Sequence, residues 1–207
     1  MQAARGTPVG GDDGDLDRGP DPSEQPEDDM AVTRRRRRTV WPIFALVAAA
    51  MLAADQYTKH LAIEHLTGQP DKPLIGDLLQ LRLTFNPGAA FSMGTELTAA
   101  ITVLAIVASV VVVVLSLRLR DRLWAVSLGL LLAGITGNLF DRLFREPQAF
   151  HGHVVDFLML PHWPIFNVAD ICINVGAALV LIQVFRGVGL DGSRTTADAD
   201  LGEDSPS

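Results

Sequence analysis

The chain has 207 residues, of which 48% are hydrophobic, with one cysteine and a formal net charge of −7. A single cysteine excludes an internal disulfide, so cysteine usage does not indicate a compartment. The negative charge lies at the two ends, because residues 1–30 hold nine acidic and two basic residues and residues 187–207 hold five and one. The body, residues 31–186, holds 10 acidic and 14 basic residues, so the net charge describes the tails.

Both tails are rich in Asp, Gly, Pro and Ser and poor in apolar residues, a composition typical of disordered segments. We therefore predict a disordered acidic cytoplasmic tail over residues 1–33 and a second disordered cytoplasmic tail over residues 187–207. One folded membrane domain occupies residues 34–186.

Four apolar stretches in that domain reach about 20 residues, the length a helix needs to cross the hydrocarbon core of a bilayer. They cover residues 40 to about 63, 97–117, 123–144 and 166–185. The first begins too far into the chain and is followed by too many others for a cleavable signal peptide. The predicted fold class is an all-α membrane protein with four transmembrane helices.

Positive charge flanks alternate ends of these spans. Arginines occupy residues 34–38 before the first span, three positions between the second and third, and Arg186 after the fourth. By the positive-inside rule both termini are cytoplasmic. An arginine run just before a span is better explained as an orientation signal than as a nucleic-acid patch, so we predict no nucleic-acid partner.

This orientation places the polar residues of the spans at one level, near the outer membrane surface. The first span ends with Asp55 and Lys59, and the third ends with Asn138, Asp141 and Arg142. The fourth span begins with Asn167 and Asp170. Ionisable groups at this depth usually pair with one another or line a functional cavity. The alternative is polar contact between helices, which would suit the Asp55–Lys59 pair and the neighbours Asp141 and Arg142.

The two outer connections complete the predicted site. Residues 64–96 contain LLQLRLTF, whose alternating pattern predicts a half-buried strand, followed by a turn at NPGAAF. We expect a small external β-strand platform between the first and second spans. Residues 145–165 carry Asp156 between apolar neighbours, and such surroundings raise the pKa of a carboxyl group.

Two facing carboxylates can share one proton, so that one activates a water while the other protonates the substrate. Asp141 is followed directly by Arg142, which favours a permanently ionised, structural aspartate. Asp156 and Asp170 have no adjacent cation and form the better catalytic pair.

Other chemistries have weaker patterns. His151, His153, Asp156 and His162 could hold a metal, but no HExxH helix is present, and we predict no metal and no cofactor. A Ser92 nucleophile with a Lys59 base lacks a GxSxG-like elbow. A proton-coupled transporter would need polar groups near the midplane, and a purely structural membrane protein would not explain Asp156.

Five motifs in this order resemble the lipoprotein signal peptidases, the type II signal peptidases of bacteria: DQYTK (55–59), NPGAAF (86–91), GNLFDR (137–142), VVDF (154–157) and FNVAD (166–170). The resemblance covers about residues 40–186. It implies an aspartic intramembrane peptidase of the bacterial cytoplasmic membrane that cuts diacylglyceryl-modified prolipoproteins before the lipid-modified cysteine, with no obligate protein partner.

The resemblance also implies residue roles. Asp156 and Asp170 would be the catalytic dyad, and the strand region would be the substrate-supporting β-cradle. Substrate binding is implied for Asn86, Asn138, Arg142 and Asn167, and a mainly structural role for Asp55, Lys59 and Asp141. The chain departs from the family's usual spacing in two places: the connection from Asp141 to Asp156 is longer, with REPQAF as an apparent insertion, and the stretch from Asp156 to Asp170 is shorter.

Deletion of residues 1–30 should leave peptidase activity nearly intact, because this segment has too little apolar content to contribute to a folded core. The arginines at 34–38 stay in the truncated protein, because they set the orientation. Turnover of purified full-length and truncated protein, at matched expression, checks this. A large loss of turnover in the truncated protein would show that the tail acts in catalysis.

Overall fold

The computed structural model describes residues 25–88 and 95–194, with side chains described over residues 40–88 and 98–194. The chain divides into two units, residues 1–35 and residues 36–207. Of the first unit only the beginning of helix α1 is described. The second unit contains the rest of α1 and every other element and side-chain contact discussed below.

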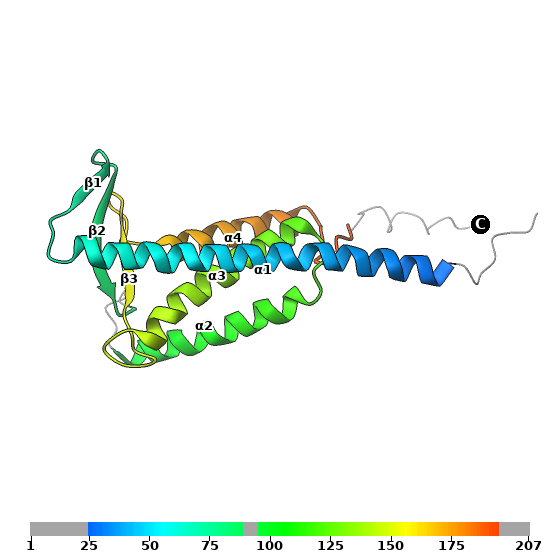
Figure 1. Ribbon diagram of the computed structural model, residues 1–207, viewed down its shortest axis with the longest axis horizontal. Coiled ribbons are helices and arrows are strands. Elements are labelled where there is room, and N and C mark those ends of the chain that lie inside the picture. Colours follow the sequence, from blue (N-terminus) through cyan, green and yellow to red (C-terminus); the bar gives the residue numbers. More distant parts are fainter. Residues whose placement is uncertain (1–24, 89–94, 195–207) are drawn as a thin grey trace, which may run out of the picture. The chain divides into compact units, whose positions relative to one another are not determined.

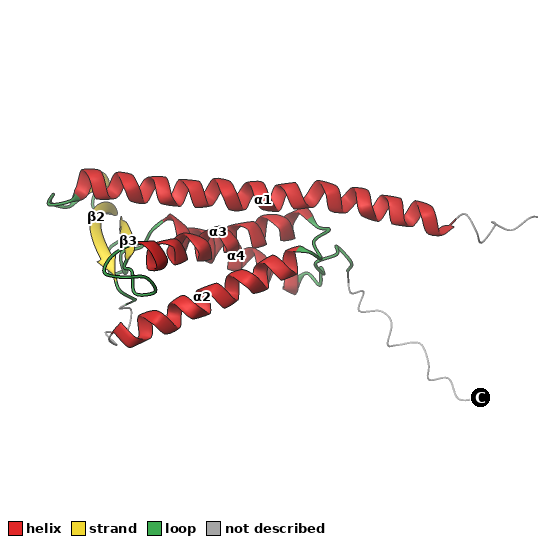
Figure 2. Ribbon diagram, turned by 60° about the horizontal axis from the view of Figure 1, so that its bottom comes forward, coloured by secondary structure: helices red, strands yellow, loops and turns green. Residues whose placement is uncertain are grey.

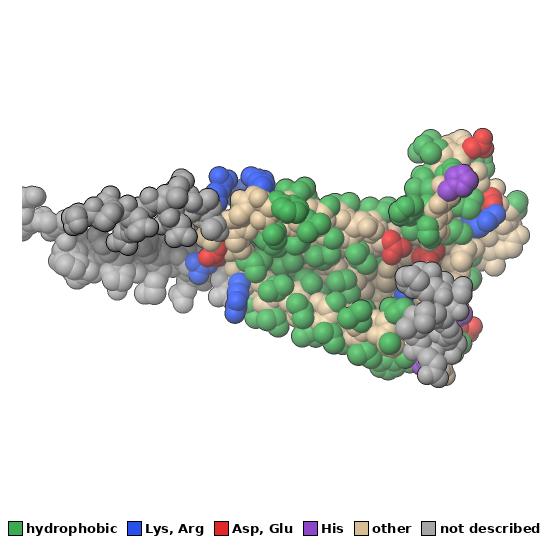
Figure 3. Space-filling view, turned by 180° about the vertical axis from the view of Figure 1, so that it is seen from behind, with side chains coloured by type: hydrophobic (Ala, Val, Ile, Leu, Met, Phe, Trp, Pro, Cys, Tyr) green, Lys and Arg blue, Asp and Glu red, His purple; other side chains and the backbone are tan. Residues whose placement is uncertain are grey.

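Four helices are long and apolar enough to cross a membrane, as predicted. Their bounds are α1 Gln25–Leu66, α2 Thr95–Ser116, α3 Arg122–Phe144 and α4 Val168–Phe185. On one face of the molecule, hydrophobic side chains cover the surface between two ends that carry charged side chains; Lys and Arg predominate at one end, and Asp, Glu and His lie at the other together with further Lys or Arg (Figure 3). The chain is thus a multi-pass membrane protein, and we call the end next to the sheet the sheet end.

The first helix begins earlier than the sequence prediction. α1 starts at Gln25, so residues 25–33 are helical although they belong to the segment predicted as a disordered tail. Pro26 stands where a helix start tolerates proline, and no glycine or further proline follows until Pro42, inside the helix. Residues 1–24 lie outside the described part.

Glycines bring α3 against α4 at close range. A Cβ atom added at Gly134 would clash with the carbonyl oxygen of Ala169, and one added at Gly176 would lie 2.9 Å from the carbonyl oxygen of Ser127. Against α1, a Cβ at Gly137 would lie 2.6 Å from Asp55 Oδ2. Small residues permit such close helix packing in membranes, so α3 has close neighbours on two sides.

The predicted platform is a three-stranded antiparallel sheet with the order β1-β2-β3, at the sheet end of the helices (Figure 1). Strand β1 is Lys72–Ile75, β2 is Leu79–Asn86 and β3 is Val154–Met159. β2 is the strand expected from LLQLRLTF. β3 was not predicted as a strand, because its apolar run does not alternate, and it joins the platform from the second connection. Phe85 pairs with Val155 and Asn86 with Val154.

The opposite end of the bundle has an apolar core that includes Phe44, Leu119 and Trp124. Residues 187–194, part of the predicted disordered tail, are described and lie against this core. Trp124 Nε1 donates to the carbonyl oxygen of Val188 at 3.0 Å, and Arg120 N donates to that of Leu190 at 3.0 Å. Apolar residues within this short segment pack against the core, which explains why residues 187–194 differ from the disordered tail that was predicted. Residues 195–207 lie outside the described part.

Gly134→Ala should destabilise the protein by about 2 kcal/mol, within the range for overpacked sites. The added methyl would meet the backbone of α4, which cannot move aside as a flexible side chain can. Thermal unfolding in detergent checks this. Leu104→Ala is the control, since Leu104 is 65% exposed, and an equal shift in both variants would contradict the packing argument.

Candidate active site

All nine residues predicted for the site lie at the sheet end of the helices. Asp55 and Lys59 are on α1, and Asn138, Asp141 and Arg142 are on α3. Asn167 and Asp170 lie at the start of α4, Asn86 is on β2 and Asp156 is on β3. Figure 2 shows the helices ending beside the strands there. The convergence inferred from the spans is therefore present.

Lys59 is the centre of this arrangement. Its side chain is fully buried, and Nζ lies 2.9 Å from Asp55 Oδ2 and 2.7 Å from Asp141 Oδ2. Nζ also donates to Asn138 Oδ1 at 3.0 Å. A buried ammonium needs such compensation, and here it comes from two carboxylates and one amide. The Asp55–Lys59 pair within α1 was predicted, and a partner for Asp141 on a neighbouring helix was one of the alternatives; Lys59 is that partner.

Asp141 forms ion pairs with two cations, and neither is the one that we expected. Its neighbour Arg142 makes no ion pair with it; the partners are Lys59 and Arg145, whose Nε donates to Asp141 Oδ1 at 2.6 Å. On a helix, residues four apart share a face while adjacent residues do not, which explains the error. Asp141 Oδ2 also accepts a hydrogen bond from Val155 N at 3.2 Å, so it fixes β3 to α3.

Asp156 projects from β3 and is 2% exposed. Asn86 Nδ2 donates to its Oδ2 at 2.9 Å, and Asn167 Nδ2 donates to its Oδ1 at 2.6 Å. Burial raises the pKa of this carboxyl to about 6, the two amide donors oppose that rise, and the nearby charge of Asp170 adds to it. The predicted effect of the apolar frame is confirmed for this residue.

Asp170 is held by the start of α4. Its backbone N–H donates to Asn167 Oδ1 at 3.0 Å, and its Oδ2 accepts from Asn167 N at 3.1 Å, which together form a capping box. Asn138 Nδ2 donates to Asp170 Oδ1 at 2.8 Å. Asn167 therefore contacts both carboxylates, through its side chain for Asp156 and through its backbone for Asp170.

Asp156 and Asp170 line one cavity of ≈ 430 Å³. Asn86 and the connection from β3 to α4 form part of its wall, and Ile171, Asn174 and Val175 continue it along α4. The connection is closed at its base by the Leu158–Phe166 bridge, in which Phe166 N donates to the Leu158 carbonyl oxygen at 2.9 Å. This pairing sets where α4 begins relative to β3.

Arg142 is the one predicted site residue outside this hydrogen-bonded network. It is 9% exposed, and its Nη1 is buried with no hydrogen-bond partner among the described residues. The same atom lies near Gly88, whose added Cβ would be 3.9 Å away. Gly88 has φ = 99°, a conformation that favours glycine, so this turn brings backbone close to the guanidinium.

The competing sites have less support. Within the described ranges no three His, Cys, Asp or Glu side chains come together as ligands for a metal ion. Ser92, the alternative nucleophile, and the Ala89–Phe91 part of the NPGAAF motif lie outside the described residues.

Three side chains near the site make contacts that were not predicted. Gln56 Nε2 donates to Asp55 Oδ2 and to the Gly137 carbonyl oxygen, each at 3.1 Å. Thr98 Oγ1 donates to the Pro87 carbonyl oxygen at 2.5 Å, which ties α2 to the turn after β2. The third is the Arg145 ion pair described above. Its i,i+4 spacing from Asp141 was a readable signal, whereas the other two depend on tertiary packing.

Comparison with known proteins agrees with this architecture. Residues 47–186 match the family model described as signal peptidase (SPase) II. A lipoprotein signal peptidase of Rhodococcus jostii is 44% identical over 165 residues, covering 79% of this chain and 80% of that protein. One from Mycobacterium avium is 46% identical over 155 residues, covering 73% and 85%.

Solved structures show the same fold. A bacterial membrane enzyme determined by the in meso method at 1.9 Å resolution superimposes with a TM-score of 0.62 at 25% identity, covering 69% of this chain and 92% of that one. A second such enzyme, at 2.3 Å, gives 0.61 at 25% identity and covers 74% and 92%. The chain therefore belongs to the signal peptidase II family and is a membrane-embedded peptidase.

Proposed function

We propose that this chain removes signal peptides from diacylglyceryl-modified prolipoproteins by aspartic catalysis, cutting just before the lipid-modified cysteine. One observation carries the proposal: Asp156 and Asp170 line the same cavity, joined through Asn167. The names of the relatives supply the substrate class, and the geometry supplies the chemistry. The enzyme lies in the bacterial cytoplasmic membrane with both termini in the cytoplasm and the sheet end at the outer face.

The pair holds one proton. Asp156, with a pKa raised to about 6, is the proton donor, and Asp170, which accepts from Asn138 and from the Asn167 backbone, is the base. Asp170 removes a proton from a water as its oxygen bonds to the scissile carbonyl carbon, and Asp156 protonates the carbonyl oxygen. The tetrahedral adduct then breaks its C–N bond: Asp170 gives the water proton to the leaving nitrogen, and Asp156 takes back a proton from a hydroxyl of the adduct as the carbonyl group re-forms. The dyad thus ends with the one proton that it held at the start.

The substrate's position follows from the cavity walls. Ile171 and Val175 lie on α4 along the cavity and suit the apolar signal peptide, which remains in the bilayer beside that helix. The diacylglyceryl chains stay in the outer leaflet. Asn86, Asn138 and Asn167 bind the substrate or hold the dyad. Arg142 Nη1 has no hydrogen-bond partner within residues 25–88 and 95–194, and it donates to a substrate carbonyl.

The structural residues have a separable role. Asp55, Lys59 and Asp141 form a buried ion cluster that joins α1 to α3, and the ion pair of Arg145 with Asp141 completes its charge balance. None of the three lines the cavity that contains the dyad. They act by fixing Asn138, which in turn fixes Asp170.

Asp156→Asn and Asp170→Asn should each reduce kcat by about 10³-fold or more, because each removes one half of a coupled acid–base pair. The amide is nearly isosteric, so thermal unfolding and precursor binding should change little. The double variant should be hardly slower than either single variant. Cleavage of a purified lipid-modified precursor, followed by mass spectrometry of the products, checks rate and cut position together.

Asp77→Asn is the matched control, since Asp77 is an exposed aspartate in the turn between β1 and β2. It should cleave normally. Substantial cleavage by either dyad variant would exclude the aspartic mechanism. Inhibition of the wild type by chelators would favour a metal site instead.

Asn86→Leu should slow cleavage and move the basic limb of the kcat/KM profile to higher pH. The lost amide donor favours the charged form of Asp156, so its removal raises the pKa further and Asp156 keeps its proton to higher pH. Rates across pH check this. Gln80→Leu is the control, since Gln80 is also on β2 but pairs with Met159, away from Asp156. An unmoved limb in Asn86→Leu would show that Asp156 is not the titrating acid.

A further inference from the structure

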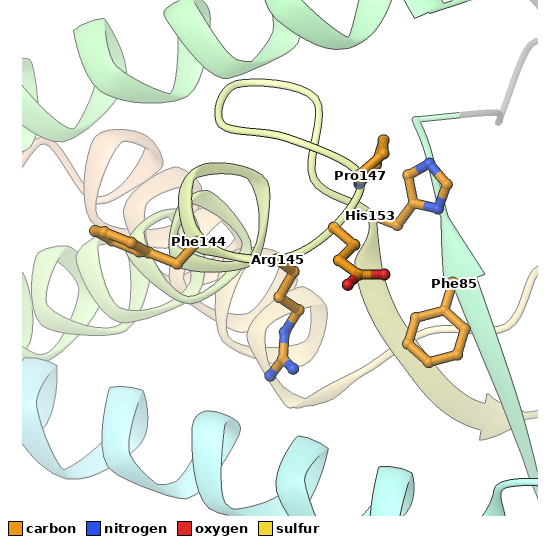
Figure 4. A pocket seen from close by; sticks show the side chains of 6 residues that line it. Phe85, Phe144, Arg145, Pro147 and His153 are labelled. Carbon is orange, nitrogen blue, oxygen red and sulfur yellow. The ribbon is translucent and has the colours of Figure 1, made fainter.

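A second cavity lies across the sheet from the dyad. Consecutive residues of a strand point to opposite faces; Asn86 faces Asp156, and its neighbour Phe85 lines a separate cavity of ≈ 600 Å³. The other lining residues are Phe144, Arg145, Glu146, Pro147 and His153. In the view of Figure 4, Arg145 lies between Phe144 on one side and Phe85 and His153 on the other. None of these residues takes part in the proposed cleavage.

The position of this cavity relates it to the membrane. The third candidate span ends at Phe144, so the cavity begins where the helix leaves the hydrocarbon layer. Phe144 is 71% exposed and stacks on Phe140, 44% exposed, with ring centroids 4.8 Å apart. Exposed aromatic rings at this depth are typical of contact with lipid. A molecule in the cavity can therefore extend along an apolar surface into the bilayer.

The charges in the cavity are of both signs. Arg145 uses Nε for Asp141, while its Nη1 and Nη2 make no hydrogen bond to another described residue, and its side chain is 25% exposed. His153 adds ring nitrogens on the same side of the sheet. Glu146 is exposed and makes no ion pair within the part of the chain that the structure describes. The cavity thus offers donors for an anion beside an acceptor for a cation.

We propose that this cavity binds the headgroup of a membrane phospholipid with a phosphodiester and a primary ammonium, that is, a phosphoethanolamine lipid. The phosphodiester lies against Arg145 and His153, since guanidinium binds phosphate oxygens well. The ammonium lies against Glu146, and an acyl chain lies on Phe144 and Phe140. This site does not depend on the cleavage reaction.

The test is native mass spectrometry of the full-length protein released from vesicles. The vesicles contain equal amounts of phosphoethanolamine, phosphocholine and phosphoglycerol lipids with identical acyl chains. The wild type should retain the phosphoethanolamine lipid in preference to the others. Glu146→Gln should reduce that retention about tenfold, the loss expected for one charge-assisted hydrogen bond, and bring it to the level of the phosphoglycerol lipid.

Two further variants sharpen the test. Glu64→Gln changes a similarly exposed carboxylate on α1 and should leave the lipid preference as in the wild type. Phe144→Ala should reduce retention of all three lipids while keeping their order, because it removes contact with the acyl chain. Equal retention of the three lipids by the wild type, or an unchanged preference in Glu146→Gln, would overturn the proposal.

Soluble glycerophosphoethanolamine separates a lipid site from a site for free phosphate esters. It carries the same headgroup without acyl chains. We therefore expect it to displace the bound lipid only at a concentration far above the one at which added phosphoethanolamine lipid displaces it. Displacement at equal concentration would overturn the lipid assignment. None of these readouts uses peptidase activity, so a failure of this proposal is distinct from a failure of the proposed mechanism.

Discussion

The burial of one ammonium group governs the architecture of this end of the protein. Lys59 has no exposed surface and balances its charge with Asp55 and Asp141. Removing one partner of such a cluster leaves an uncompensated charge in a low-dielectric interior, which is far more costly than never forming the cluster. The partners come from α1 and α3, and Asp141 also holds Val155 of β3. One buried cation thus requires two helices and the sheet to meet at a fixed geometry.

The side-chain amides of Asn138 and Asn167, which carry no charge, connect this ion cluster to Asp156 and Asp170. Asn138 accepts from Lys59 and donates to Asp170. Asn167 donates to Asp156 and to Asn138, and it is the N-cap of α4. An amide can join an ion cluster to a carboxylate without adding charge to either. The two aspartates therefore lie close to the ion cluster without a direct ion pair to Lys59 among the described residues.

The spans, the strand β2 and the convergence of polar residues could be predicted because they follow from hydropathy, alternation and orientation. The partner of Asp141 was mispredicted because sequence adjacency was given more weight than helical spacing, which favours Arg145. β3 was missed because both faces of VVDF are buried, and such a strand does not alternate. Thr98 could not be found, since its contact with Pro87 exists only after α2 has packed beside the sheet.

The Leu158–Phe166 bridge has a consequence for how this enzyme can vary. The two backbone hydrogen bonds between these residues close the connection at its base, before the chain reaches Pro161, His162 and Trp163. The spacing between β3, which carries Asp156, and the start of α4, which carries Asp170, is thereby set before the loop tip. Insertions, deletions and substitutions at the tip can accumulate without altering the spacing of the carboxylates. The part of the cavity wall formed by this loop can thus change while Asp156 and Asp170 keep their positions.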